Sequence, residues 1–109
     1  MPFPDAQHAI VAEEKVRDYL LNPNHPVGGP KAAWFDSLGY SLTEAHCLAD
    51  DLLQIARTSN DFIAKPSRFG VKYQTSGWIG RPGHRLAAVV TIWLVEQNSP
   101  PRLITAYPS

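Results

Sequence analysis

Residues 85–95, with the sequence RLAAVVTIWLV, decide the fold class of this 109-residue chain. A long apolar run rich in β-branched residues is typical of a central strand that is covered on both faces. Turn formers at residues 97–101 end the run, and residues 102–107 (RLITAY) predict one more strand. Upstream, the turn formers of residues 80–84 separate the run from residues 69–75, where apolar and polar side chains alternate as in a half-buried strand. Such closely connected strands predict an antiparallel meander of three to four strands.

The first half of the chain predicts helices. Residues 12–21 place apolar side chains at helical spacing, and Asn22-Pro23 ends that helix because the residue before a proline avoids the α region. A loop of turn formers over residues 22–30 leads to a second short helix at 31–38. The sequence Ser41-Leu42-Thr43-Glu44 matches a capping box, which predicts a third helix from there to about residue 58.

The order of these elements predicts the architecture. Residues 31–65 and 83–99 contain none of the ten prolines, and we expect the regular elements to lie in these windows. Residues 9–11 are a further candidate for a short edge strand. Because helices precede strands, we predict a single α+β domain over residues 1–109, with the helices packed on one face of the meander.

Composition and charge exclude several classes of protein. Hydrophobic residues make up 44% of the chain, which excludes a disordered tail, and the single cysteine excludes a disulfide scaffold. We find no apolar window near the ~20 residues of a membrane span and no secretory signal, and therefore expect a soluble protein in the cytoplasm. Ten Lys and Arg balance ten Asp and Glu, so we do not expect broad coating of nucleic acid, whereas a site for one or two phosphates stays open.

His25 and Lys31 are the first candidate site residues. They lie six residues apart on a glycine- and proline-rich turn that leads into a predicted helix N-terminus, where free backbone N–H groups suit an anion. Histidine is well suited to proton transfer near neutral pH. The alternative is structural: His25 caps a turn and Lys31 is a solvated cation.

The final strand provides the second candidate pair. Strand alternation puts Thr105 and Tyr107 on one face, together with Leu103, and puts Arg102 on the opposite face. A hydroxyl and a phenol two residues apart can orient a phosphate or donate a proton, although both residue types are also favoured in strands for packing alone.

Other candidate residues lie in the predicted hairpin turn. We expect Arg81 and His84 to face solvent, where they are candidates for substrate binding. The sequence contains no C-x-x-C, H-E-x-x-H, EF-hand, P-loop or G-x-S-x-G motif, so we expect no metal and no cofactor.

Two motifs resemble a small bacterial family of uncharacterised domains. The first is YLLN-x-x-HP-x-G at residues 19–28, followed by Lys31, and the second is RLITAYP at residues 102–108. The resemblance covers nearly the whole chain. More distantly, the layout of N-terminal helices, a His/Lys segment and a final strand reading TAYP is similar to the barnase/RelE-like superfamily of small RNases, which are often toxins in bacterial conflict systems.

This resemblance implies a function. It implies metal-independent endoribonuclease activity, in which the RNA 2′-hydroxyl attacks the adjacent phosphate. His25 is then the general base or acid, and Lys31 holds the phosphate. Thr105 and Tyr107 position the phosphate or the leaving oxygen, and Arg102 is a second cation.

Three functions remain open from the sequence. The leading hypothesis is an RNase of toxin type, with RNA as substrate and a neutralising antitoxin or immunity protein as partner. The alternatives are a non-catalytic interaction or immunity-type protein on the same fold and an enzyme acting on a small nucleotide or another non-RNA substrate. We expect no membrane partner, and the sequence does not determine the oligomeric state. The leading hypothesis requires His25, Lys31, Thr105 and Tyr107 to lie together.

Overall fold

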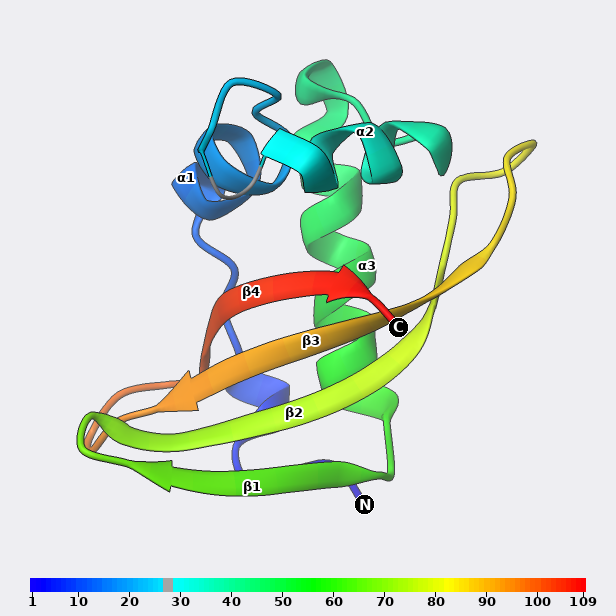
Figure 1. The fold of residues 1–109 in the computed structure, drawn as a ribbon. Coiled ribbons are helices and arrows are strands. Elements are labelled where there is room, and N and C mark those ends of the chain that lie inside the picture. Colours follow the sequence, from blue (N-terminus) through cyan, green and yellow to red (C-terminus); the bar gives the residue numbers. More distant parts are fainter. Residues whose placement is uncertain (27–28) are drawn as a thin grey trace.

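The last 48 residues form one antiparallel sheet in the computed structural model, which describes residues 1–26 and 29–109 (Figure 1). The strands are paired in chain order, and their bounds are β1 Phe62–Ser67, β2 Gly70–Ile79, β3 Ala87–Val95 and β4 Arg102–Pro108. The predicted α+β fold and antiparallel meander are therefore confirmed, with four strands. The predicted edge strand at residues 9–11 is limited to an isolated parallel bridge between Ile10 and Arg102.

One strand was not predicted. β1 contains Pro66, and prolines served as boundaries of the predicted elements. A proline is tolerated in an edge strand, where its missing N–H group removes no bond between strands. β1 pairs only with β2 and all of its residues are exposed. The two central strands also differ slightly from the prediction, because β2 continues to Ile79 and β3 begins at Ala87.

The helices precede the sheet, as predicted. Their bounds are η1 Ala6–His8, α1 Glu13–Lys15, η2 Val16–Leu20, α2 Gly29–Ser37, η3 Leu42–Glu44 and α3 Ala45–Thr58. The segment predicted as one helix over residues 12–21 is α1 followed directly by the π-helix η2. The predicted loop at 22–30 is wrong for Gly29 and Pro30, which begin α2, and its residues 27 and 28 lie outside the described residues.

The predicted capping box is also wrong. The Ser41 side chain makes no capping bond, and its Oγ atom lies 3.1 Å from Thr43 Oγ1 instead. The 3₁₀ turn η3 separates Ser41 from α3, so the position that precedes α3 is Glu44.

α3 and the N-terminal segment cover one face of the sheet, and in Figure 1 α3 lies behind the strands. Leu48, Leu52 and Ile55 form the apolar stripe of α3 and are buried. From the N-terminal segment, the Phe3 ring stacks on Tyr73 of β2 with 4.9 Å between ring centroids. α1 and α2 lie beside the β4 edge of the sheet rather than over it (Figure 1). No helix among the described residues is long and apolar enough to span a membrane.

The two faces of the sheet differ in burial. The face toward α3 is sealed, and its buried side chains are Thr75, Ile79, Val89, Thr91, Trp93, Leu103 and Ala106. The other face, which we call the open face, carries exposed or half-buried side chains at Lys72, Gln74, Ser76, Trp78, Ala88, Ile92, Thr105 and Tyr107. β3 was expected to be covered on both faces. On the open face only its Val90 and Leu94 are buried.

A register shift in β4 changes which residues share the open face. Ile92 pairs with Thr105 and Trp93 with Leu103, so one extra residue, Ile104, is accommodated in β4. An extra residue reverses the alternation of side chains on one side of it. Thr105 and Tyr107 therefore share a face as predicted, but Arg102 joins them and Leu103 does not, which corrects the prediction for these two residues.

A short hydrogen-bond chain satisfies the polar groups inside the core. Trp93 Nε1 donates to Thr91 Oγ1 at 2.8 Å, and Thr91 Oγ1 donates to the Thr75 carbonyl oxygen at 3.0 Å. Thr91 and Trp93 are both fully buried. The threonine hydroxyl thus links an indole to a backbone group across β2 and β3.

We expect Thr91→Val to lower the free energy of unfolding by about 1–3 kcal/mol, because valine keeps the shape but leaves the buried indole N–H without an acceptor. Urea denaturation measures the change. The control is Thr43→Val at an exposed position of η3, for which we expect a change within about 0.5 kcal/mol. Equal losses in the two variants would contradict the role assigned to Thr91.

Candidate functional site

Lys31 lies at the centre of a cluster formed by three elements. Its Nζ atom donates hydrogen bonds to Tyr19 Oη of η2 and to Thr105 Oγ1 of β4, both at 2.8 Å. Tyr19 Oη and Thr105 Oγ1 are themselves 3.1 Å apart, so the three polar atoms form a closed triangle. All three side chains are half-buried. We call Tyr19, His25, Lys31, Thr105 and Tyr107 the lysine cluster.

The loop before α2 brings Lys31 to this position. Asn22 organises it, since its side-chain oxygen accepts a hydrogen bond from the Asn24 backbone N–H at 3.0 Å. The Gly29 N–H then donates to the His25 carbonyl oxygen at 2.8 Å, which starts the helix. A Cβ atom at Gly29 would lie 2.6 Å from the Pro23 carbonyl oxygen. Only glycine permits this close approach, which sets the loop against the first turn of α2.

The charge of Lys31 has no acidic counterpart. It lies in the first turn of α2, where the helix dipole favours anions over cations, and that turn has no acidic residue. Among the described residues, Lys31 makes no ion pair with a carboxylate. Its two hydrogen-bond acceptors are neutral hydroxyls. The cluster therefore keeps a positive charge in a half-buried position, an arrangement that suits an anion such as phosphate.

Two aromatic rings lie close to the Lys31 ammonium group. Lys31 Nζ lies 4.9 Å from the centroid of the Tyr19 ring and 5.9 Å from that of the Tyr107 ring, within the range of cation–π attraction. The His25 ring packs edge-on against the Tyr19 ring, with 4.9 Å between the ring centroids. A second cation is close, because Lys15 Nζ lies 5.0 Å from the Tyr19 ring centroid. The structure thus brings His25, Lys31, Thr105 and Tyr107 together around Tyr19, while their chemical roles stay predictions.

The two lysines change the acidity of Tyr19. Partial burial acts to raise its pKa, but hydrogen bonds from Lys31 and Thr105 and the positive charges of Lys31 and Lys15 outweigh this effect. The net result is that the pKa of Tyr19 lies below its ordinary value. A phenol with a lowered pKa gives up its proton more readily, so Tyr19 is a candidate proton donor.

The other predicted substrate-binding residues lie elsewhere. Arg102 is on the open face, but its guanidinium group binds the Glu96 carboxylate at 3.2 Å. Arg81 and His84 pack over Gly39, beyond the C-terminal end of α2. Gly39 follows Lys31 by eight residues, a separation of roughly 12 Å at 1.5 Å per helical residue. The structure does not bring these three side chains into the lysine cluster.

Sequence reasoning missed Tyr19 and Lys15. The helical spacing of residues 12–21 puts Tyr19 on the apolar face of the predicted helix. This spacing does not distinguish a tyrosine that packs in the core from one that takes part in a functional site. The signal that was available is the motif at residues 19–28, which begins with Tyr19 and includes His25. Lys15 is one helical turn before Tyr19, a spacing that puts the two side chains on the same helix face.

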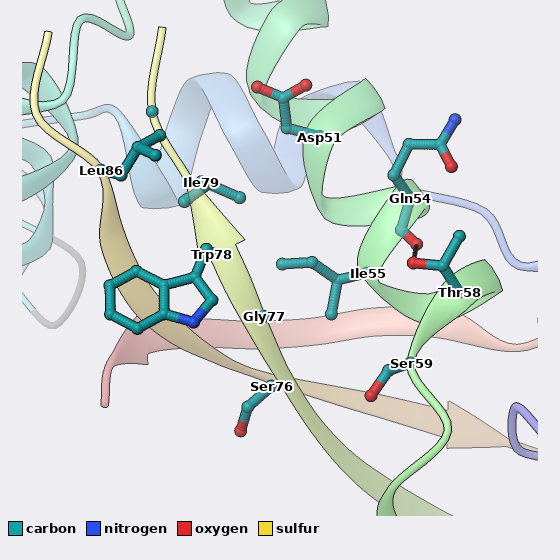
Figure 2. A pocket seen from close by; sticks show the side chains of 11 residues that line it. Asp51, Gln54, Ile55, Thr58, Ser59, Ser76, Gly77, Trp78, Ile79 and Leu86 are labelled. Carbon is teal, nitrogen blue, oxygen red and sulfur yellow. Dashed lines mark hydrogen bonds between the residues drawn. The ribbon is translucent and has the colours of Figure 1, made fainter.

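A separate groove of about 280 Å³ lies between α3 and the end of β2 (Figure 2). Its walls include Asp51 and Gln54 of α3 and the segment from Ser76 to Gly80. It contains none of the predicted site residues. The described residues also hold no group of three or more His, Cys, Asp or Glu side chains that could bind a metal ion. The predicted site residues that lie close together do so in the lysine cluster, outside this groove.

Comparison with known proteins gives a family and a fold. A family model described as "Domain of unknown function (DUF6883)" matches residues 2–109. A chain from a contact-dependent growth inhibition toxin–immunity protein complex of Klebsiella pneumoniae 342 has a similar structure, with a TM-score of 0.75 over 92% of this chain and 99% of that chain. The two chains are 17% identical, a level at which the likeness concerns the fold alone. No curated protein sequence matches significantly.

The acidity of Tyr19 can be measured directly. We expect one tyrosine to titrate below the ordinary value of 10.0, followed by ultraviolet absorbance of tyrosinate or by NMR of labelled tyrosine. Tyr19→Phe should remove this transition, which assigns it. Lys31→Met should raise the pKa of Tyr19, because it removes a hydrogen bond and a positive charge that stabilise the phenolate. Lys65→Met, which removes a cation from β1, is the control, and an identical titration in both lysine variants would contradict the arrangement.

Proposed function

The chain belongs to the DUF6883 family, and we propose that it is a metal-independent RNase of toxin type that cleaves RNA through attack of the 2′-hydroxyl on the adjacent phosphate. The observation that carries this proposal is the half-buried Lys31 ammonium, hydrogen-bonded to the hydroxyls of Tyr19 and Thr105. Cleavage of RNA in this way needs a group that removes a proton, a group that returns one and a positive charge at the phosphate. The lysine cluster contains residues for each task.

Binding of the phosphate is the first task. Lys31 Nζ is held by two neutral acceptors, and a phosphate oxygen that replaces one of them gains a charge-assisted hydrogen bond. The Thr105 hydroxyl can then donate to a second phosphate oxygen. Tyr107 lies on the same face of β4, two residues along the strand, where its hydroxyl can contact the phosphate or the neighbouring ribose.

Proton transfer is the second task. In the proposed reaction His25 removes the proton of the 2′-hydroxyl while the bond from O2′ to phosphorus forms. The bond from phosphorus to O5′ breaks, and Tyr19 gives its phenolic proton to the leaving oxygen. The products are a 2′,3′-cyclic phosphate and a 5′-hydroxyl. Lys31 stabilises the phenolate that Tyr19 becomes, in accord with the lowered pKa of Tyr19, and solvent carries the proton from His25 back to it.

The toxin context rests on the similarity of fold. The similar chain comes from a toxin–immunity protein complex, and the likeness extends over 99% of that chain. A role in a toxin system also fits the predicted resemblance to small RNase toxins. We therefore propose a neutralising immunity protein or antitoxin as the partner of this chain.

The same complex supports a second candidate function. It contains an immunity protein as well as a toxin, so a non-catalytic, immunity-type protein on this fold is the alternative. The two candidate functions assign different roles to Lys31. An immunity-type protein requires no proton-transfer groups beside the ammonium, whereas His25 and Tyr19 lie in contact there. This contact favours the enzyme.

Cleavage of RNA tests the proposal. Purified protein incubated with total RNA in EDTA should cut it and leave 2′,3′-cyclic phosphate and 5′-hydroxyl ends. We expect His25→Ala to lower the rate about 10²- to 10⁴-fold, as for loss of a general base, and Lys31→Met about 10²- to 10³-fold, as for loss of one charge-stabilising donor.

Matched controls remove a histidine and a cation from α3. His46→Ala and Arg57→Met alter exposed residues and should leave the rate unchanged. Circular dichroism establishes that each variant is folded. Folded wild-type protein that leaves all RNA intact would contradict the enzyme and favour the immunity-type alternative.

A further inference from the structure

The acidic residues lie outside the strands that the structure describes. None of the ten Asp and Glu residues lies in any of the four strands that the structure describes. The strands carry three cations instead, Lys65, Lys72 and Arg102, and all three are on the open face. A net charge of zero thus coexists with a sheet face whose own side chains carry only positive charge.

The two lysines on this face lie opposite each other on neighbouring strands, and no carboxylate among the described residues neutralises either of them. Lys65 and Lys72 are direct cross-strand partners, and like charges in such a pair are unfavourable. Among the described residues neither forms an ion pair with a carboxylate. Arg102 is the exception, since Glu96 partly neutralises it. The open face is complementary in charge to a polyanion.

Trp78 adds an aromatic surface to this face. It is 71% exposed, although a large apolar side chain in a strand is ordinarily covered. Figure 2 shows its indole on the side of β2 opposite to Ile55 of α3, so it points away from the core. Its partner on β3 is Ala88, whose small side chain leaves the space beside the indole open.

The position of Trp78 relates it to the lysine cluster. Tyr107 pairs with Val90, one step along β3 from Ala88 on the same face. Neighbouring strands are about 4.8 Å apart and each residue advances about 3.4 Å along a strand, so Trp78 on β2 and Tyr107 on β4 are separated by roughly 12 Å. Thr105, which binds Lys31, is in register with Ile92 and by the same count lies roughly 17 Å from Trp78, so a chain of a few nucleotides that leaves the lysine cluster can reach the indole.

We propose that the open face binds a single-stranded stretch of RNA, with Trp78 stacking against the base of a nucleotide one to three positions from the phosphate held at Lys31. This inference rests on the proposed RNase function and adds the class of substrate. Stacking on a flat aromatic ring requires a base whose face is free, as in a loop or an unpaired end, whereas a duplex hides both faces of its bases. Lys72 and Lys65 lie on the other side of the Thr105 register, roughly 20 Å along β2 from Trp78, and extend the positive surface in that direction.

The inference is tested by binding alone, so that cleavage does not enter the measurement. The probe is a fluorescent 2′-O-methyl oligonucleotide of about 12 nucleotides, which has no free 2′-hydroxyl to attack its phosphates. Fluorescence anisotropy gives its affinity for the full chain. We expect Trp78→Ala to weaken binding about 5- to 150-fold, the loss that follows removal of one base–aromatic stack. Trp78→Phe, which keeps a ring, should retain most of the affinity.

The matched control is Phe69→Ala. Phe69 is 61% exposed and lies beside Arg68, but it occupies the β1–β2 hairpin, nine residues and about 30 Å of strand from Trp78. Its removal should leave affinity unchanged. The same oligonucleotide annealed to its complement should bind more weakly than the single strand.

The outcomes separate this inference from the proposed function. Unchanged affinity in Trp78→Ala, or equal binding of duplex and single strand, would overturn the inference even if the protein cleaves RNA, and the exposed indole would then be assigned to a protein contact. Trp78-dependent binding by a protein that leaves RNA uncut would support the single-strand surface and overturn the RNase. A loss in Phe69→Ala equal to that in Trp78→Ala would show unspecific attraction to charge and would also overturn the inference.

Discussion

The hydrogen bonds of the Lys31 ammonium connect the two halves of this fold. Lys31 comes from α2, and its acceptors come from η2 and from β4, so one charged group joins the helical part of the chain to the edge of the sheet. The hydroxyl acceptors satisfy two hydrogen-bond donors of the Lys31 ammonium but do not neutralise its positive charge. The positive N-terminal end of the α2 dipole lies close to this charge and adds to the local positive potential. The contact that joins the helices to β4 therefore leaves a half-buried positive charge, on which the proposed binding of phosphate depends.

The sheet can offer one face to a ligand because the other face carries the core. α3 and Phe3 cover the side that holds the buried Thr91 and Trp93, and the threonine hydroxyl satisfies the indole there. On the open face of β3 only Val90 and Leu94 are buried, so most positions of this face can carry polar or exposed side chains. The extra residue Ile104 in β4 decides what this face displays, since it turns Arg102 to the same side as Thr105 and Tyr107.

Much of the fold could be predicted from local patterns, and the site only in part. The apolar run of β3 and the helical stripe of α3 are strong signals because burial dictates nearly every residue. β1 was missed because its proline, Pro66, was taken as a boundary between elements. A proline is incompatible only with interior strands, and the sequence does not reveal which strand lies at an edge of the sheet. The proximity of Lys31 and Thr105 was a condition of the RNase hypothesis rather than a consequence of any pattern, and the structure shows the contact. The part played by Tyr19 depends on how η2 packs against β4, which no spacing along the chain encodes.

The separation of acidic residues from the strands has a consequence for how this molecule meets a charged partner. The isoelectric point near 6.9 reflects only the total charge of the protein. A polyanion in solution also interacts with the electric dipole moment, which arises when positive and negative groups occupy different parts of the surface. Such a moment exerts a torque that turns the sheet toward the polyanion before contact, and encounter rates of this kind fall as ionic strength rises. An electrically neutral protein can in this way have oriented, salt-sensitive association.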